Sequence, residues 1–495
     1  MKLKNMIQVK QFLPACILGL MLLFTSCNKW LDVNPKTQIK EDDQFNTKQG
    51  FTDGLFGIYQ TAAKQDSYGK HLSFGTLDIL AQRYENKSIT TSIMYKLARY
   101  NYTDSEVQRV IDSVFNNNYA AIAQANFILK NVDNGVLDDN TKAIVKGESI
   151  GMRAFLHFDL IRLFSPAYND GANASAPSIA YVKEFKVSPT ARLTVGEALA
   201  LCEADLKEAE QLLSAFPYID QIAFNQGSVN PDLFMQFRQN HLNYWAVKAT
   251  LARLYQFKGD KANALKYALE VINSKQFAFI NQTTLNVDAT AEGSDLTFSS
   301  EHIYSAYVSR LKTTVDALFK PTTSVGEATD LWSLKTNLNA MYQTSLANYG
   351  TDIRSHIASK SLWSELSATI VYSKKLWSDN SKNVKQRLVP IIKLAEMYYI
   401  AAEAAPSIAE GTNYLNVVRV ARLIPALSPA PATQALFDAE VQLEYRKEFY
   451  AEGQLWFYYK RKGVTTIPGG SVSMTNLQYT FPIPNAELEF GTPVN

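Results

Sequence analysis

The chain has 495 residues, of which 46% are apolar and 19% are charged, and its formal net charge is +2. This near balance of charge argues against a nucleic-acid-binding protein, which would carry a basic patch or stripe. Three cysteines are too few for a disulfide framework, so a chain of this length must be stabilised by a large apolar core.

The first 26 residues are typical of a lipoprotein signal peptide. Three lysines precede an apolar run over residues 12–24, which is shorter than the roughly 20 residues of a membrane-spanning helix. The sequence LFTSC that follows is similar to a bacterial lipobox, in which small residues precede the cysteine that receives diacylglycerol. We therefore predict cleavage before Cys27 and lipidation of Cys27. A plain cleaved signal and an uncleaved anchor are the alternatives.

Cleavage would leave a nearly neutral mature chain with 46 basic and 47 acidic side chains. Cys202 would be its one unmodified thiol, and the apolar residues around it favour a small core residue over a reactive one.

Residues 27–49 are polar and contain Pro35, which indicates a tether between the lipid and the fold. We expect a single domain over residues 50–495.

From residue 50 onward the apolar residues follow a helical period. The segment GFTDGLFGIYQTAA places Phe51, Leu55, Ile58 and Tyr59 on one helix face. Similar patterns predict helices over residues 104–131, 141–164, 195–213, 241–259, 261–274, 389–405, 413–423 and 436–459. The predicted fold class is therefore mostly α.

Two of these helices fit the spacing of a tetratricopeptide-like repeat. Small residues recur where two antiparallel helices would pack closely, and a tyrosine would fill the space beside them. The residues at these positions are Leu251, Ala252, Tyr255, Gly259, Ala264 and Ala268. Weaker pairs occur near residues 151–164 and 394–423, so we expect a helix-turn-helix scaffold over residues 50–280 and 386–460.

Residues 281–385 interrupt the helical pattern. They are rich in Thr, Ser, Asn, Asp and Gly, which are typical of turns and long loops. A loop-rich segment of this length is uncommon in a compact domain unless it has a function. We expect short strands near residues 302–307 and 368–372, and ligand contacts from the loops.

No catalytic or metal-binding motif is present in the sequence. The five histidines form no HExxH motif and the cysteines do not cluster, while GxSxG, Walker, GxGxxG and EF-hand patterns are missing. The paired carboxylates of a glycoside hydrolase leave little trace in a sequence, so that alternative stays open. We predict a binding protein with no catalytic residue, no metal site and no cofactor.

Aromatic residues stand out in segments that we interpret as loops. An aromatic ring with polar neighbours suits an amphipathic ligand, because the ring face stacks on C–H surface while the polar groups meet hydroxyls or carboxylates. For each residue, packing onto the core is an equally good interpretation. The candidate ligand-binding residues are Asp78, Arg83, Tyr84, Tyr102, Tyr307 and Trp332.

Taken in order, several motifs resemble the SusD/RagB family of outer-membrane nutrient-binding lipoproteins. They span the mature chain and read CNKWLDVNP, ANFILKNVD, GESIGMRAFLHFDLIRLF, KATLARLYQFKGDKANALKYALEVI, IIKLAEMYYIAAEA, LNVVRVARLI, LEYRKEFYAEGQLWFYYKRKG and YTFPIPNAELEFG. The chain departs from the family pattern at Leu455, where an arginine is usual, and at Tyr458, where an aspartate is usual.

The resemblance implies a surface-exposed, lipid-anchored outer-membrane protein that binds an oligosaccharide. It also implies delivery of that ligand to a SusC-like TonB-dependent transporter, with the helical scaffold facing the transporter. An oligopeptide ligand, as in RagB-like members, is the main alternative. A tetratricopeptide-like assembly protein without a small ligand is a weaker one.

Charged residues of these motifs lie on otherwise apolar predicted helices. Buried charges have to be paired, so we interpret them as ion pairs that fix helix packing rather than as ligand contacts. The residues concerned are Glu148, Arg153, Glu396, Arg419, Arg446, Glu448 and Glu452.

Overall fold

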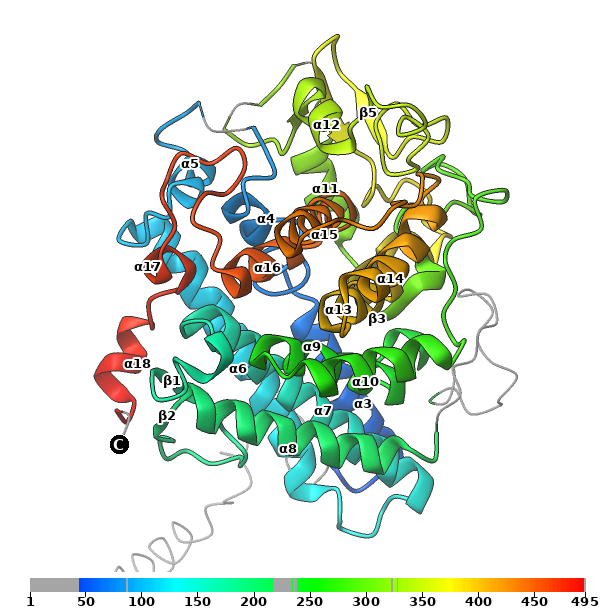
Figure 1. Ribbon diagram of the computed structural model, residues 1–495. Helices are drawn as coiled ribbons and strands as arrows, with labels where there is room; N and C mark the ends of the chain where they lie inside the picture. The colour runs from blue at the N-terminus through cyan, green and yellow to red at the C-terminus, as the bar shows by residue number, and fades with distance from the viewer. Residues whose placement is uncertain are drawn as a thin grey trace, which may run out of the picture. The chain divides into compact units, whose positions relative to one another are not determined.

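The computed structural model describes residues 44–85, 88–216, 234, 238–321, 324–326 and 328–493. Cys27, the predicted signal peptide and most of the predicted tether lie outside these residues. The chain from Thr47 to Asn495 forms one compact unit, which is described below. Within it helices dominate and the strands are short, which confirms the predicted fold class (Figure 1).

The secondary structure has the following bounds. The longer helices are α3 (Lys48–Ala62), α6 (Ser105–Asn131), α7 (Asp139–Phe164), α8 (Val195–Leu213), α9 (Tyr244–Lys258), α10 (Lys261–Asn273), α13 (Leu394–Ala404), α14 (Ile408–Ala421) and α15 (Gln434–Glu448). The shorter ones are α4 (Thr76–Leu80), α5 (Ile93–Ala98), α11 (Leu311–Phe319), α12 (Lys335–Tyr342), α16 (Gln454–Lys462), α17 (Asn476–Tyr479) and α18 (Asn485–Phe490). The strands are β1 (Pro177–Ala180), β2 (Arg192–Thr194), β3 (His302–Tyr307), β4 (Ser333–Leu334), β5 (Trp363–Glu365), β6 (Ile370–Ser373) and β7 (Leu388–Lys393).

The long helices begin where local capping chemistry allows it. Asp104 and Asp138 accept hydrogen bonds from the first free backbone N–H groups of α6 and α7. Thr194 and Glu197 cap each other reciprocally at the start of α8. Figure 1 shows α6 to α10 stacked in the lower half of this view, and consecutive helices of this series pack against each other.

The pair α9 and α10 confirms the tetratricopeptide-like spacing. Ala252, Ala264 and Ala268 are fully buried between the packed helices. Gly259 ends α9 in the left-handed conformation with φ of 78°, and a Cβ there would collide with the Asp170 side chain. Only glycine meets both requirements at this turn, which explains the short connection to α10.

The loop-rich segment contributes strands to two small sheets and adds two helices to the scaffold. β3 pairs with β7 in antiparallel fashion, and β4, β6 and β5 form a second sheet in that order. The strand predicted over residues 302–307 is confirmed, and the second one begins two residues later than predicted. Our prediction missed α11, whose buried residues Leu311, Val315 and Leu318 have helical spacing.

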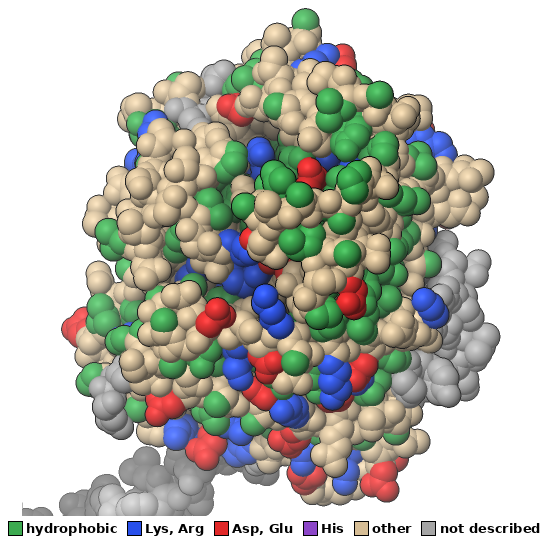
Figure 2. Space-filling view, viewed as in Figure 1, with side chains coloured by type: hydrophobic (Ala, Val, Ile, Leu, Met, Phe, Trp, Pro, Cys, Tyr) green, Lys and Arg blue, Asp and Glu red, His purple; other side chains and the backbone are tan. Residues whose placement is uncertain are grey.

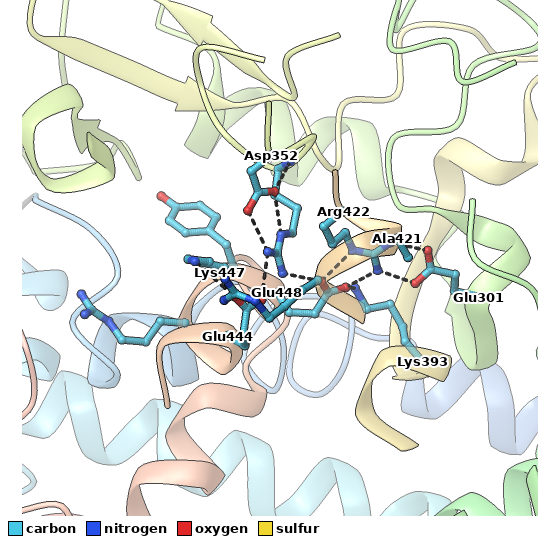
Figure 3. Close-up of polar contacts among 12 residues, drawn as sticks. Glu301, Asp352, Lys393, Ala421, Arg422, Glu444, Lys447 and Glu448 are labelled. Atoms are coloured by element: carbon cyan, nitrogen blue, oxygen red, sulfur yellow. Dashed lines mark hydrogen bonds and ion pairs between the residues drawn. The ribbon is translucent and has the colours of Figure 1, made fainter. Parts of the chain in front are cut away.

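A network of buried ion pairs connects this segment to the scaffold (Figure 3). At its centre, the Glu448 carboxylate of α15 accepts hydrogen bonds from Arg422 at 2.8 Å, Lys393 at 2.7 Å and Arg354 at 3.0 Å. Arg422 also binds Glu301. Every one of these side chains is almost fully buried, so each charge depends on its partners for solvation.

The structure confirms most of the ion pairs that the sequence suggested and supplies the partners. Arg153 of α7 pairs with Asp205 of α8 at 2.7 Å, and Glu396 of α13 pairs with Arg253 of α9 at 2.6 Å. The remaining pairs are Glu148–Arg238, Arg419–Glu444 and Glu452–Lys393. The exception is Arg446, which has no ion-pair partner among the described residues.

We predict that Glu448→Gln strongly destabilises the fold. The substitution keeps the shape but leaves three buried cations without their shared anion, which costs about 3–5 kcal/mol of unfolding free energy. Chemical denaturation measures the loss. Glu440→Gln on the same helix is the control, because Glu440 is 29% exposed and 3.6 Å from Arg419, so its loss stays below about 1 kcal/mol. Equal losses for both variants would contradict the central role of Glu448.

We also predict that acid weakens the fold through Glu444. Burial alone would raise the pKa of Glu444, but Arg354, Lys447 and Arg419 outweigh it and lower the pKa from 4.5 to about 2. A lowered acid pKa stabilises the folded state fully above pH 4.5, and this stabilisation is lost as the pH falls toward 2. Unfolding free energies between pH 5 and pH 3 should fall more steeply for the wild type than for Glu444→Gln. Identical slopes would refute the assignment.

Candidate functional site

The candidate site is a cavity of about 150 Å³, which we call the Arg83 cavity. It lies where the segment after α4 meets α12, α15 and the loop after α16. Its walls are formed by Gln82, Arg83, Glu85, Ser333, Asn337, Leu338, Ala340, Met341, Arg446, Tyr450, Pro468 and Gly469. Figure 2 shows Lys and Arg side chains inside hollows of this face of the molecule.

Backbone and amide hydrogen bonds place Arg83 at this position. The chain leaves α4 with Gln82 in the left-handed region at φ of 59°. The Gln82 amide donates to the Ala98 carbonyl at 2.8 Å and to the Tyr100 hydroxyl at 3.0 Å. The backbone N–H of Glu85 donates to the Trp332 carbonyl at 3.0 Å. The segment is therefore fixed on both sides of Arg83 without any ion pair.

Arg83 is 8% exposed, and the hydrogen-bond donors of its guanidinium are only partly satisfied. Nη2 donates to the Arg446 carbonyl at 2.7 Å, and the guanidinium carbon lies 4.8 Å from the centre of the Tyr450 ring. The buried Nε has no hydrogen-bond partner among the described residues. A buried donor without a partner is uncommon in a folded protein, and this one belongs to a side chain that lines a cavity.

Arg446 reaches the same cavity from α15. Its buried Nε also has no hydrogen-bond partner within the described part of the chain. Burial lowers the pKa of Arg446, and although Tyr459 opposes this, the charge of Arg83 lowers it further. Among the described carboxylates, none lies within 4.0 Å of either arginine. Two like charges therefore share one small cavity with no described carboxylate in ion-pair contact with them.

Asp78 and Tyr84 lie beneath the cavity rather than in its wall. Both are almost fully buried, and the Tyr84 hydroxyl donates to the Phe74 carbonyl at 2.8 Å. The Asp78 carboxyl accepts from the Gly453 N–H at 3.0 Å. Burial raises the pKa of Asp78 to about 7, against the opposing effects of Arg83 and the Gly453 N–H. These two candidates contact the protein itself, and ligand contact by them stays a prediction.

Trp332 also lies near the cavity, whereas Tyr102 and Tyr307 lie elsewhere. Trp332 is 8% exposed and precedes Ser333 of the cavity wall. The Tyr102 hydroxyl donates to the Gln478 carbonyl at 2.6 Å. Tyr307, at the end of β3, is 45% exposed, and its hydroxyl accepts from Arg387 at 2.8 Å. The structure thus brings four of the six candidates to one region, and only Arg83 lines the cavity.

Tyr307 lines a second, larger cavity of about 410 Å³ between α3 and β3. Its wall is mostly aromatic, and it includes Phe56, Tyr59, His241 and Tyr304. Tyr59 stacks on His241 with ring centres 4.6 Å apart and donates to the buried Glu148 carboxylate at 2.7 Å. Burial lowers the pKa of His241, and the charge of Arg238 lowers it further. This aromatic cavity can stack the face of a sugar ring or an apolar side chain.

A third cavity, of about 440 Å³, lies between α9, α13 and α16 and is lined by charges that neutralise each other. Arg461 pairs with Glu403 at 2.7 Å, and Lys462 lies 3.5 Å from Asp438. The contrast with the Arg83 cavity is direct. Here the arginine has its carboxylate, so the charges of this cavity already satisfy one another.

Sequence reasoning missed most of the cavity wall. Arg446 was interpreted as part of a structural ion pair because it lies in an otherwise apolar motif on α15. Glu85 and Asn337, which bind each other at 2.5 Å, and Tyr450 gave no signal that could be distinguished from an ordinary loop or core residue. Arg83 was found because charged and aromatic residues cluster around it.

The described residues contain no trio of His, Cys, Asp or Glu side chains arranged to hold a metal ion. None of the helices in the described part of the chain is both long and apolar enough to cross a bilayer.

Two family models match the sequence in separate regions. A SusD-like family, whose description reads starch-binding associating with outer membrane, matches residues 29–256. The SusD family matches residues 323–468. No curated protein matches the sequence.

Several solved structures share the fold at low sequence identity. A SusD superfamily protein from Bacteroides thetaiotaomicron is 20% identical with a TM-score of 0.66, and the matched region covers 90% of this chain and 98% of that protein's chain. A putative sugar binding protein from Bacteroides vulgatus is 23% identical with a TM-score of 0.63, covering 90% and 97%. A laminarin binding SusD-like protein is 16% identical with a TM-score of 0.63, covering 90% and 98%.

Proposed function

Because the chain belongs to the SusD/RagB family, we propose that it is a lipid-anchored, non-enzymatic protein of the outer-membrane surface that binds nutrient oligosaccharides. It would deliver its ligand to a SusC-like TonB-dependent transporter. The starch-binding description of the matching family and the laminarin-binding neighbour both support a glycan as ligand.

The observation that carries the proposal is the pair of unsatisfied arginine donors in the Arg83 cavity. Glycan hydroxyls and ring oxygens are acceptors that such donors hold in place, and Asn337 on the rim can add further hydrogen bonds. The volume of about 150 Å³ is below the roughly 300–1,000 Å³ of pockets that enclose whole ligands. The cavity would therefore hold one unit of an oligomer whose remainder lies outside.

A glycan array with the purified mature protein tests this function, followed by titration of the bound oligosaccharides. We expect saturable binding without turnover, and Arg83→Ala should weaken it at least tenfold, or about 1.4 kcal/mol. Asn337→Ala, on the exposed rim, should weaken it less. The control is Arg109→Ala, which removes the same charge from the exposed face of α6.

Three results would contradict this function in different ways. Binding of a peptide library but of no glycan would replace the ligand with an oligopeptide. Hydrolysis of a bound glycan would make the protein an enzyme. Unchanged affinity of a folded Arg83→Ala protein would place the ligand elsewhere, with the aromatic cavity at Tyr307 as the next site to test.

The anchor generates a separate prediction for Cys27, which lies outside the described residues. Burial of acyl chains contributes about 0.8 kcal/mol per CH₂ group, so a multiply acylated Cys27 holds the protein on a membrane. Cys27→Ala should release the protein from the membrane fraction or stall its processing. Cys16→Ala, within the predicted signal peptide, is the matched control and should leave lipid labelling intact. Normal processing and membrane retention of the Cys27 variant would refute the lipobox.

A further inference from the structure

We infer that the Arg83 cavity recognises an anionic group, a carboxylate or a sulfate ester, carried by the oligosaccharide. This inference rests on the proposed function and specifies the ligand class of the same site. It concerns Arg83 and Arg446, which reach the cavity from segments far apart in the sequence.

The first argument is the excess of hydrogen-bond donors in the cavity. Arginine only donates hydrogen bonds, and the Nε atoms of both Arg83 and Arg446 are buried without a described acceptor. The other polar groups of the wall satisfy each other. Asn337 donates to Glu85 at 2.5 Å, and the hydroxyls of Ser333 and Tyr450 lie 2.8 Å apart. A carboxylate or sulfate matches this cavity because its oxygens are purely acceptors.

The second argument is the missing counterion. Elsewhere in the protein, buried arginines have carboxylate partners, as Arg354 and Arg422 do with Glu448. Neither Arg83 nor Arg446 has a described carboxylate within 4.0 Å, and Arg83 is 8% exposed. A desolvated cation such as Arg83 costs stability without an anion unless a ligand supplies one.

The acids around the cavity do not remove this requirement. Asp78 attracts Arg83 electrostatically, but it lies outside the cavity wall and forms no ion pair with Arg83, and its carboxyl accepts from the Gly453 N–H and, at 3.3 Å, from the Tyr84 hydroxyl. Glu85 is partly exposed on the rim and accepts from Asn337. Among the residues that line the wall, two arginines face one glutamate, so the wall itself carries an excess of positive charge.

The size of the cavity fits a substituent rather than a complete oligomer. About 150 Å³ accommodates one charged group with part of its sugar ring, while the rest of the chain remains outside. Two convergent guanidinium groups can hold a planar carboxylate or a tetrahedral sulfate by several charge-assisted hydrogen bonds. The selectivity would come from charge at one position along the glycan.

The experiment compares matched acidic and neutral glycans by isothermal titration with the purified mature protein. One arm uses a galacturonic acid hexamer and its carboxyl-reduced form. The other arm uses a sulfated galactan oligosaccharide and its desulfated form. We expect at least one acidic member to bind tenfold or more tightly than its neutral form, and this preference should shrink as NaCl rises from 50 to 200 mM. The two arms separate a carboxylate from a sulfate.

Variants of Arg446 connect this preference to the cavity. Arg446→Gln should weaken binding of both forms, but it should lower the ratio of acidic to neutral affinity at least tenfold. Arg446→Lys, which keeps the charge, should restore part of the preference. Arg109→Gln, with the same change in net charge on exposed α6, should have no effect. Circular dichroism verifies that each variant is folded.

The outcomes distinguish this inference from the proposed function. Equal or tighter binding of the neutral forms, or an acid preference that survives Arg446→Gln, would overturn the anionic ligand and leave glycan binding intact. The absence of binding to either acidic probe would also overturn it. Binding of none of the four glycans nor of any member of the glycan array would overturn both.

Discussion

The structure depends on the buried carboxylate of Glu448, which three cations from separate parts of the chain share. Arg422 follows α14, Lys393 ends β7 and Arg354 belongs to the loop-rich segment, so one anion joins the scaffold to the loops. Because all of these groups are desolvated, removing any one of them takes away part of the pairing on which its buried partners depend. The last turn of α15 is therefore held in a single position. Glu444, Lys447 and Glu448 share one face of that turn by their i, i+3 and i+4 spacing, which leaves Arg446 to project elsewhere.

The last turn of α15 therefore contributes to both the ionic network and the Arg83 cavity, from different faces. The Arg446 side chain lines the cavity while its backbone carbonyl, 363 positions along the chain, accepts from Arg83. The ionic network fixes that carbonyl, and the carbonyl in turn orients the guanidinium of Arg83. The cations near the end of α15 thus fall into two groups with opposite surroundings. Those of the network are neutralised inside the protein, and those of the cavity have no described carboxylate within 4.0 Å, as the proposed anionic ligand would require.

The sequence predicted the scaffold better than the site because helices depend on residues close together in the sequence, whereas the site depends on residues far apart in it. Helical periodicity and the small residues around Gly259 are local patterns, and they identified α9 and α10 within a few residues. The burial of Asp78 and Tyr84 is a tertiary property, and a polar, aromatic segment looks the same whether its side chains point inward or outward. Arg446 was misread for the same reason. Ion pairs were expected of every charge in its motif, and only the structure shows which of them has no carboxylate nearby.

The separation of network and cavity also bears on how such a scaffold accommodates different ligands. Arg83 is positioned by backbone and amide contacts of Gln82 and Glu85, so its charge is not needed to hold its own segment in place. A change of side chain at Arg83 or Arg446 would alter the chemistry of the cavity without unpairing the Glu448 network. The charges of that network cannot be exchanged singly in this way. Solved structures of the same fold share only 15–23% of their residues with this chain, which is consistent with a packing that tolerates extensive substitution. If the Arg83 cavity is the binding site, as we propose, the fold fixes where a ligand group can lie and a few cavity side chains determine which group it is.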